Sequence, residues 1–183
     1  MRLFTAVRFP KNVIESFSEI IRLAREVFPD ARFVTPENLH LTLVFIGETE
    51  KEAQARYALE KAGERYRREN GKPVTICFNS LGTFRSKGGD IFWAGIRNDA
   101  SLSELQSLLL KELADVGYSV DRRAFKPHIT LARKLKASKE KIDQFESRII
   151  LPDSFEADTA SLVLSHRRDG ILCYDDIAET LLT

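Results

Sequence analysis

The chain has 183 residues, 43% of them hydrophobic and 30% charged, with a formal net charge of +1. This length predicts one domain, or two tightly joined lobes, with a buried core. A near-neutral charge excludes a global field that attracts nucleic acid, so any anionic ligand must be held by local positive charge. No run approaches the ~20 apolar residues of a membrane span, and we expect no signal peptide at the N-terminus.

The two cysteines, Cys77 and Cys173, both lie in apolar, strand-like surroundings. In a chain without an export signal, these thiols are expected to be buried and reduced rather than joined in a disulfide. We therefore expect an intracellular protein located in the cytoplasm.

Apolar periodicity predicts alternating strands and helices. The first half is expected to contain a strand at 3–9, a helix at 12–28, a strand at 39–46, a helix at 51–69 and a strand at 74–84. The second half is expected to contain a strand at 91–96, a helix at 101–115, a strand at 127–132, a short helix at 138–148 and strands at 155–165 and 171–177. Ser101, with Glu104 three residues later, predicts a capping box at the start of the third helix.

Two short motifs stand at matching places in the two halves: His-Leu-Thr at residues 40–42 and His-Ile-Thr at residues 128–130. An arginine precedes each histidine at nearly the same separation, Arg8 by 32 positions (40 − 8) and Arg97 by 31 (128 − 97). Chance alignment of alternating elements is the competing explanation. The shared tripeptide favours an internal duplication.

Residues two apart on a strand point to the same face, about 7 Å apart. His40 and Thr42 therefore share one face, and His128 and Thr130 repeat the arrangement in the second half. The opposite face of the first strand is apolar and is the expected core side, with Leu39, Leu41, Leu43 and Phe45. Two such strands around a pseudo-two-fold axis would bring two imidazoles and two hydroxyls onto one tetrahedral anion.

This arrangement suits phosphodiester cleavage without a metal. A neutral imidazole takes a proton from the attacking oxygen and an imidazolium gives one to the leaving oxygen, and the ordinary histidine pKa of about 6.5 allows both forms near neutrality. Threonine hydroxyls can donate to non-bridging phosphate oxygens. A lone histidine on a strand is more often structural, but two of the three histidines here share a motif. The third, His166, is expected at the surface, with substrate contact as the alternative.

Longer segments around these motifs resemble the two-histidine (2H) phosphoesterases, specifically the LigT-like RNA 2′,3′-cyclic phosphodiesterases. The matching segments are RLFTAV from residue 2, PENLHLTLVFIG from residue 36, LGTF from residue 81, FWAG from residue 92 and FKPHITLAR from residue 125. A single His-x-Thr would be weak support. The two extended motifs and their separation are together specific.

The resemblance implies the α+β class and a duplicated bilobal 2H phosphoesterase (LigT-like) fold, with antiparallel sheets flanking a central cleft and helices outside. It implies a single domain over residues 1–183, made of two pseudo-symmetric lobes, with the first repeat at about 1–86 and the second at about 90–183. The implied activity is hydrolysis of a terminal RNA 2′,3′-cyclic phosphate to a 2′-phosphomonoester. Members have also been described as 2′-5′ RNA ligases, which is the same chemistry run toward bond formation. No cofactor is implied.

By the same analogy, His40 is the general acid that protonates O3′ and His128 is the general base that activates water, although the sequence does not determine this order. Thr42, Thr130 and Arg133 are the implied phosphate ligands. Arg133 follows the second motif and can curl back into the mouth of the cleft. No metal ligand is implied.

Two segments depart from the family pattern, because residues 85–90 lack a proline often found there and residues 165–170 are unusually basic. Substrate length and base preference therefore stay open. Basic residues near the second motif could contact RNA, with a solvated basic face as the alternative: Arg122, Arg123, Lys126, Arg133, Lys134, Lys136, Arg167 and Arg168. Arg65, Arg67 and Arg68 of the helix at 51–69 are expected to be plain surface. Phe84 and Trp93 are expected in the core, with base stacking as the alternative.

Two rival interpretations remain. A metallohydrolase needs clustered ligands, and without a His-Glu-x-x-His or a cysteine pair at metal spacing, a three-histidine site of His40, His128 and His166 is the candidate. A catalytically idle module that binds RNA ends is the other rival. The expected partners are RNA with a 2′,3′-cyclic phosphate end, including tRNA fragments, or nucleoside 2′,3′-cyclic phosphates. No membrane partner is expected, and a monomer is the expected state.

Overall fold

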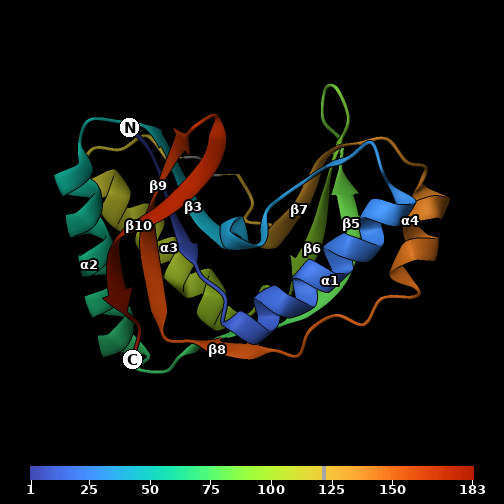
Figure 1. Ribbon diagram of the computed structural model, residues 1–183. Coiled ribbons are helices and arrows are strands. Elements are labelled where there is room, and N and C mark those ends of the chain that lie inside the picture. The colour runs from blue at the N-terminus through green and yellow to red at the C-terminus, as the bar shows by residue number, and fades with distance from the viewer. Residues whose placement is uncertain (121–122) are drawn as a thin grey trace.

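The computed structural model describes residues 1–120 and 123–183, which are organised around two four-stranded antiparallel sheets (Figure 1). The first sheet has the strand order β10 (Ile171–Leu181), β9 (Thr159–Arg168), β1 (Arg2–Val7) and β3 (Leu41–Glu48). The second sheet has the order β2 (Arg32–Phe33), β7 (His128–Leu135), β6 (Asp90–Ile96) and β5 (Phe78–Phe84). A separate ladder joins β4 (Val74–Ile76) and β8 (Phe155–Ala157).

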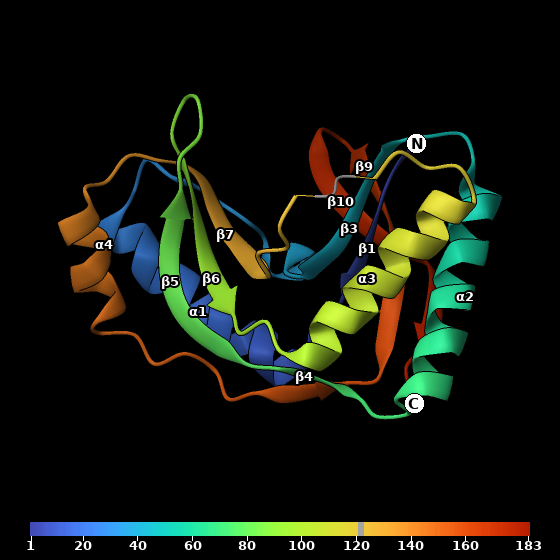
Figure 2. The ribbon, with the colours of Figure 1, turned by 180° about the vertical axis from the view of Figure 1, so that it is seen from behind.

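The helices lie on the outer sides of the two sheets. Their bounds are α1 (Lys11–Val27), α2 (Glu52–Glu69), α3 (Ala100–Asp115) and α4 (Lys139–Glu146). A short 3-10 turn, η1 (Pro36–Asn38), lies between the sheets and leads into β3 (Figure 1). Helices α2 and α3 cover the first sheet, whereas α1 and α4 flank the second (Figures 1 and 2). The Phe28 ring at the end of α1 lies 5.9 Å from Phe92 of β6 and 5.5 Å from Phe145 of α4. These observations confirm the α+β class with antiparallel sheets and outer helices.

The two halves of the chain are interleaved between the sheets. Strand β1 pairs with β3 and β6 pairs with β7, so the strand–helix–strand order recurs around each His-x-Thr motif. The intervening helices cross over, because α1 packs on the second sheet and α3 on the first (Figure 2). Strands β9 and β10 from the second half complete the first sheet, and β5 from the first half completes the second. The repeats at 1–86 and 90–183 therefore do not each build one lobe.

Several boundaries differ from the sequence expectation. The predicted strands at 74–84 and 155–165 are interrupted at Cys77 and Asp158, and the two parts of each join different ladders. Helix α3 is capped by Asp99, whose carboxylate accepts from the backbone N–H of Leu102 at 2.9 Å, so the predicted capping box at Ser101 is wrong. The Ser101 hydroxyl instead donates to Asp99. Asp99 is the N-cap because its extended backbone directs the carboxylate at the free N–H groups of the first turn.

A β-bulge in β3 changes which side chains reach the core. Thr5 pairs with Val44 while Ala6 pairs with Thr42, so Leu43 is an extra residue on β3. Leu43 and Val44 are consequently both buried, and Phe45 is 47% exposed. The prediction that Phe45 lies on the core side is therefore wrong, because strict alternation fails at a bulge.

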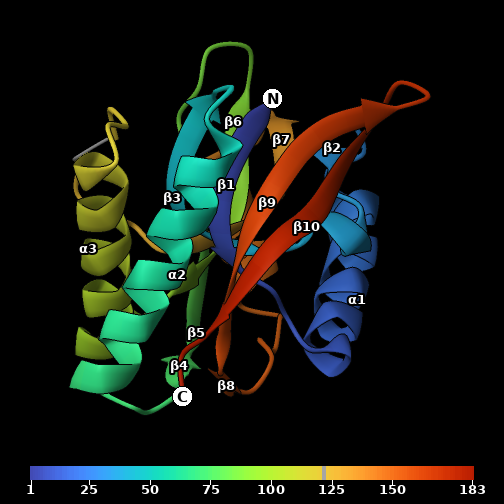
Figure 3. The same ribbon diagram turned by 90° about the vertical axis from the view of Figure 1, so that its left-hand side faces the viewer.

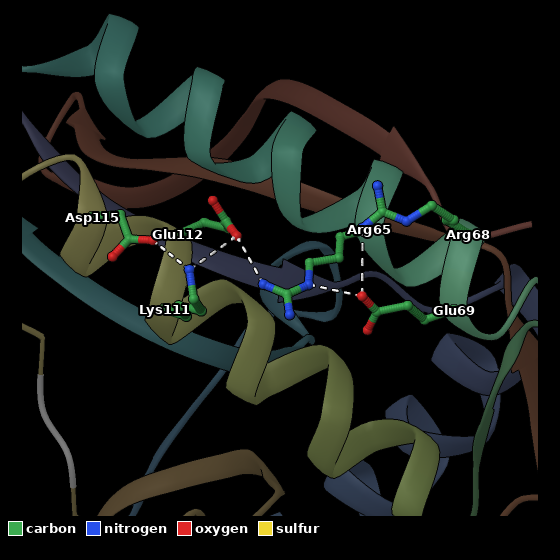
Figure 4. Close-up of polar contacts among 6 residues, drawn as sticks. All are labelled: Arg65, Arg68, Glu69, Lys111, Glu112 and Asp115. Carbon is green, nitrogen blue, oxygen red and sulfur yellow. Dashed lines mark hydrogen bonds and ion pairs between the residues drawn. The ribbon is translucent and has the colours of Figure 1, made fainter.

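Helices α2 and α3 are joined by a partly buried network of ion pairs (Figure 4). The Arg65 guanidinium contacts Glu69 on its own helix at 2.9 Å and Glu112 of α3 at 3.6 Å. Lys111 contacts Asp115 at 2.6 Å. Arg65 thus links the two helices rather than being plain surface.

Helix α2 also packs closely on β10, where a Cβ added at Gly63 would lie 2.0 Å from the Thr180 hydroxyl oxygen. The long β9–β10 hairpin extends beyond the other strands of the first sheet (Figure 3). Cys77 and Cys173 are free thiols, as expected, but both are half-buried rather than buried. None of the helices within the described ranges is long and apolar enough to cross a bilayer.

Candidate active site

The first His-x-Thr motif lies on the face of the first sheet that is turned away from α2 and α3, which we call the inner face. A small apolar cluster separate from the main core lies on this face: Phe4, Ala6, Val163 and Tyr174. The His40 ring contacts this cluster, with its centroid 4.8 Å from Phe4 and 5.1 Å from Tyr174. Thr42 pairs with Ala6 and therefore shares the face.

The second motif begins β7, with His128 paired to Gly95 and Thr130 to Trp93 of β6. Strands β3 and β7 are neighbours in space although they belong to different sheets. Phe84 contacts the His128 ring edge-on at 4.9 Å between centroids. Each motif histidine is thus held by an aromatic side chain.

Both imidazoles make the same backbone contact. Nδ1 of His40 lies 2.7 Å from the Asn38 carbonyl oxygen, and Nδ1 of His128 lies 2.7 Å from the Lys126 carbonyl oxygen. Because a carbonyl oxygen only accepts, Nδ1 carries the hydrogen in both rings. The neutral imidazoles therefore each keep a lone pair on Nε2. Nε2 of His40 lies 3.0 Å from the Thr42 hydroxyl, which donates to it in this state.

The electrostatics of the site place the two histidines and Arg133 within reach of one another. Burial, together with the positive charges of Arg8, His128 and Arg133, lowers the pKa of His40 to about 4, although the contact with the Asn38 carbonyl acts in the opposite direction. Burial also lowers the pKa of His128, with Arg133 contributing. Both imidazoles are consequently neutral at neutral pH in the unliganded protein. A bound anion would offset the neighbouring positive charge and favour protonation.

The lowered pKa of His40 predicts a loss of stability in mild acid. Between about pH 4 and 6.5 the unfolded chain binds more protons at this residue than the folded protein does, so stability falls as pH is lowered. From pH 7 to 4.5 this single residue is expected to cost about 2–3 kcal/mol of unfolding free energy. Urea unfolding at both pH values should show a smaller pH dependence for His40→Gln than for the wild type. An unchanged dependence in that variant would assign the acid sensitivity to other groups.

Arg8 is a residue of this site that the sequence motifs did not reveal. Val7 pairs with Leu41, so the next position in the antiparallel register brings Arg8 opposite His40. The Arg8 Nε donates to the Asp176 carboxylate at 2.8 Å, and Nη2 donates to the Tyr174 carbonyl at 2.9 Å. Its Nη1 is buried and has no hydrogen-bond partner.

The spacing match between Arg8 and Arg97 does not hold in three dimensions. Gly95, not Arg97, lies opposite His128, and the Arg97 side chain is exposed. Counting along strand pairs, rather than along the chain, would have identified Arg8. The two histidine environments are therefore unequal, because Arg8 lies opposite His40 in its strand pair and Gly95 lies opposite His128.

Phe84 and Trp93 border the second motif instead of joining the core as expected. Both side chains are half-buried, and their ring centroids are 5.0 Å apart. A Cβ at Gly82 would lie 2.5 Å from the Trp93 ring, so this glycine lets the indole lie against β5. The two rings therefore lie on the face of the second sheet that carries His128 and Thr130.

His166 points away from the motif histidines. Its neighbour Ser165 pairs with Tyr174 of the inner face, so His166 occupies the opposite face of the β9–β10 hairpin. Its Nε2 lies 2.7 Å from the Asp175 carboxylate, and Arg168 contacts the same carboxylate at 3.8 Å. The surface location is as expected. In the ranges 1–120 and 123–183, no group of three or more His, Cys, Asp or Glu side chains could hold a metal ion.

The remaining basic residues of the second motif lie at its exposed edge. Arg133 is exposed on β7 opposite Arg32 of β2. Lys126, Lys134 and Lys136 are exposed as well. Arg122 lies outside the described residues.

Known proteins resemble this chain in both sequence and fold. The sequence profile of the 2′-5′ RNA ligase superfamily matches residues 10–170. The chain belongs to the 2′-5′ RNA ligase superfamily. It is 31% identical over 144 residues to an RNA 2′,3′-cyclic phosphodiesterase of Archaeoglobus fulgidus, covering 78% of each protein. It is 34% identical to the RNA 2′,3′-cyclic phosphodiesterase of Escherichia coli, covering 72% of this chain and 71% of that protein.

Solved structures of the superfamily share the whole fold. The crystal structure of E. coli LigT complexed with 3′-AMP has a TM-score of 0.75 and 28% identity, covering 100% of this chain and 98% of that one. The crystal structure of TT0787 of Thermus thermophilus has a TM-score of 0.74 and 25% identity, covering 100% and 98%. Both sheets and all the outer helices of this chain are thus part of the shared superfamily fold.

Proposed function

We propose that this chain is an RNA 2′,3′-cyclic phosphodiesterase that hydrolyses a terminal cyclic phosphate to a 2′-phosphomonoester. Relatives of that name match most of the chain. The observation that carries the proposal is the matched Nδ1–carbonyl contact of His40 and His128. It leaves two Nε2 atoms, each on a strand with a threonine two residues later, to exchange protons with one substrate.

The proposed reaction needs two proton transfers. One imidazole Nε2 takes a proton from water as the water oxygen bonds to phosphorus. The other, protonated, imidazole gives its proton to O3′ as the O3′–P bond breaks, which leaves the phosphate on O2′. Thr42, Thr130 and Arg133 are proposed to donate to the non-bridging oxygens as charge develops there. Neutral His40 needs a proton to act as the acid, and an anionic substrate next to it would favour that proton.

The acid and base can be assigned with a substrate in which sulfur replaces O3′. A thiolate leaves without protonation, so loss of the acid should matter little with this substrate while loss of the base still matters fully. With His40 as acid and His128 as base, His40→Ala is expected to recover most of its activity on the sulfur substrate. Recovery in His128→Ala instead would reverse the assignment. The test discriminates between the two assignments because burial disfavours protonation of His40 in the unliganded protein, whereas the assignment makes His40 the acid.

Metal independence is tested by turnover in excess EDTA. Wild-type protein is expected to cleave a nucleoside 2′,3′-cyclic phosphate and a cyclic-phosphate oligoribonucleotide at unchanged rates after chelation. Loss of activity on chelation, restored by added metal ion, would overturn the metal-free mechanism. An idle RNA-end-binding module would bind the oligonucleotide but turn over neither substrate, which would overturn the proposed function.

The same groups can support bond formation. If the 5′-hydroxyl of a second RNA replaces water as the nucleophile, the same two proton transfers produce a 2′-5′ phosphodiester. We therefore propose reversible 2′-5′ ligation as a secondary activity at high concentrations of RNA ends, measurable as a joined product sensitive to the His128→Ala change.

A further inference from the structure

The β3 bulge creates an exposed aromatic residue on the inner face. Its geometry is held by Thr5, which is fully buried and whose hydroxyl oxygen accepts from the Val44 backbone N–H at 3.1 Å. This contact satisfies an amide at the bulge, where the strand ladder is irregular. As a result, Phe45 is directed away from the core.

Phe45 shares the inner face with the first His-x-Thr motif. It pairs directly with Phe4, and directly opposed residues of an antiparallel ladder project from the same face. Phe4 in turn contacts the His40 ring. The level of Phe45 is two residues along β1 from that of Thr42, or roughly 7 Å. A row of aromatic side chains therefore leads from His40 past the buried Phe4 to the exposed ring of Phe45.

A cation accompanies the exposed ring. The Arg2 guanidinium carbon lies 5.0 Å from the centroid of the Phe45 ring, and Arg2 is itself exposed. Glu48 pairs with Arg2 across the strands, and its carboxylate lies 4.0 Å from the N-terminal amine. Arg2 thus presents a planar positive group on top of an aromatic ring. Nucleobases stack on both aromatic rings and guanidinium planes, and the positive charge suits the adjoining phosphate.

We propose that Arg2 and Phe45 form a subsite for the nucleotide immediately 5′ of the terminal cyclic phosphate, with its base stacked on this pair. The inference rests on the proposed function, since it extends the same bound RNA strand along the inner face. The base would stack irrespective of its identity, because every base has a flat π-face. The subsite would make the protein prefer an RNA end over a free cyclic nucleotide.

The test compares a cyclic-phosphate trinucleotide with a nucleoside 2′,3′-cyclic phosphate. Base–aromatic stacking of about 1–3 kcal/mol corresponds to roughly 5- to 150-fold. Phe45→Ala is expected to lower the ratio of kcat/KM for the trinucleotide to that for the mononucleotide by this factor. Phe45→Tyr should retain most of the ratio, and Arg2→Met should lower it in part. An unchanged ratio in Phe45→Ala would overturn the subsite.

The matched control is Tyr57→Ala on α2, because Tyr57 is 53% exposed and lies 5.6 Å from the Lys61 ammonium, outside the inner face. This variant is expected to have wild-type kcat/KM values for both the trinucleotide and the mononucleotide. In addition, removing the base of the penultimate nucleotide should lower the wild-type kcat/KM for the trinucleotide to the value of Phe45→Ala. Phe45→Ala should then lose little more when it is given this abasic trinucleotide. Additive losses would overturn the stacking contact.

The failure of the proposed function can be distinguished from the failure of the subsite. The affinity for a trinucleotide carrying a 2′-phosphate can be compared between the wild type and Phe45→Ala by fluorescence anisotropy, which requires no turnover. Absent hydrolysis of both substrates would overturn the proposed function, while a selective loss of trinucleotide binding would still support the subsite. Normal mononucleotide hydrolysis with unchanged trinucleotide binding and turnover would overturn the subsite alone.

Discussion

Alanine at His40 or at His128 is expected to lower kcat for a nucleoside 2′,3′-cyclic phosphate by about 10²–10⁴-fold, with a smaller change in KM. The reason is that each Nε2 is assigned one proton transfer, and water cannot replace a positioned imidazole. Steady-state kinetics with EDTA present, alongside circular dichroism to verify folding, measures this effect. The double variant should be only slightly worse than either single variant, because the two residues act as a unit.

His166→Ala is the matched control for this prediction. His166 is the third histidine of the chain and lies on the opposite face of the β9–β10 hairpin, paired with Asp175. The variant should retain wild-type kcat. If His128→Ala kept activity within tenfold of the wild type while His166→Ala lost it, the assignment of the catalytic pair would be wrong.

Removing the charge of Arg133 by Arg133→Met is expected to lower kcat/KM by about 10²–10³-fold, the range for a lost donor to a developing oxyanion. Arg133 also acts on both histidines, since its charge lowers the pKa of each. Its removal should therefore raise both pKa values. Because the base must be neutral to act, the acidic limb of the kcat/KM profile is expected to move to higher pH.

Lys136→Met is the control for Arg133→Met, because it removes one positive charge from an exposed position just beyond the end of β7. This variant should leave both the rate and the pH profile close to the wild type. A loss of equal size in Lys136→Met would mean that Arg133 acts through general attraction of the anionic substrate. A loss in Arg133→Met without a shift of the acidic limb would contradict its proximity to the base.

Local rules predicted the elements that carry the site. Helix α1 follows the 3.6-residue period of its apolar residues, and its buried positions are those of the expected stripe: Val13, Phe17, Ile20, Ile21 and Ala24. The pairing of His40 with Thr42, and of His128 with Thr130, on one face follows from the two-residue period of a strand. The sequence prediction is wrong where a nearby residue caps more effectively than the predicted one, since Asp99 rather than Ser101 caps α3.

Periodicity along the chain does not predict the register between strands that are distant in sequence. Along the chain, only the separation of Arg8 from His40 distinguishes it, and its place opposite that ring is set by the β1–β3 ladder. The same holds for its contact with Asp176, which lies 168 residues away in sequence. Phe84 and Trp93 are expected in the core because aromatic residues usually bury there, yet both are half-buried on the face that carries the second His-x-Thr motif.

By itself, the sequence determined the chemical groups of this protein and their faces: two His-x-Thr strands, a following arginine and the helices that flank them. These features depend on the strand period of 2 residues and the helix period of 3.6 residues, which are local properties of the backbone and do not depend on the rest of the fold. The tertiary structure alone decided that the two halves interleave, that Arg8 stands beside His40, and that Phe45 leaves the core. The last outcome depends on a hydroxyl 39 residues away from the amide it satisfies, and a contact of that range exists only once the sheet has formed.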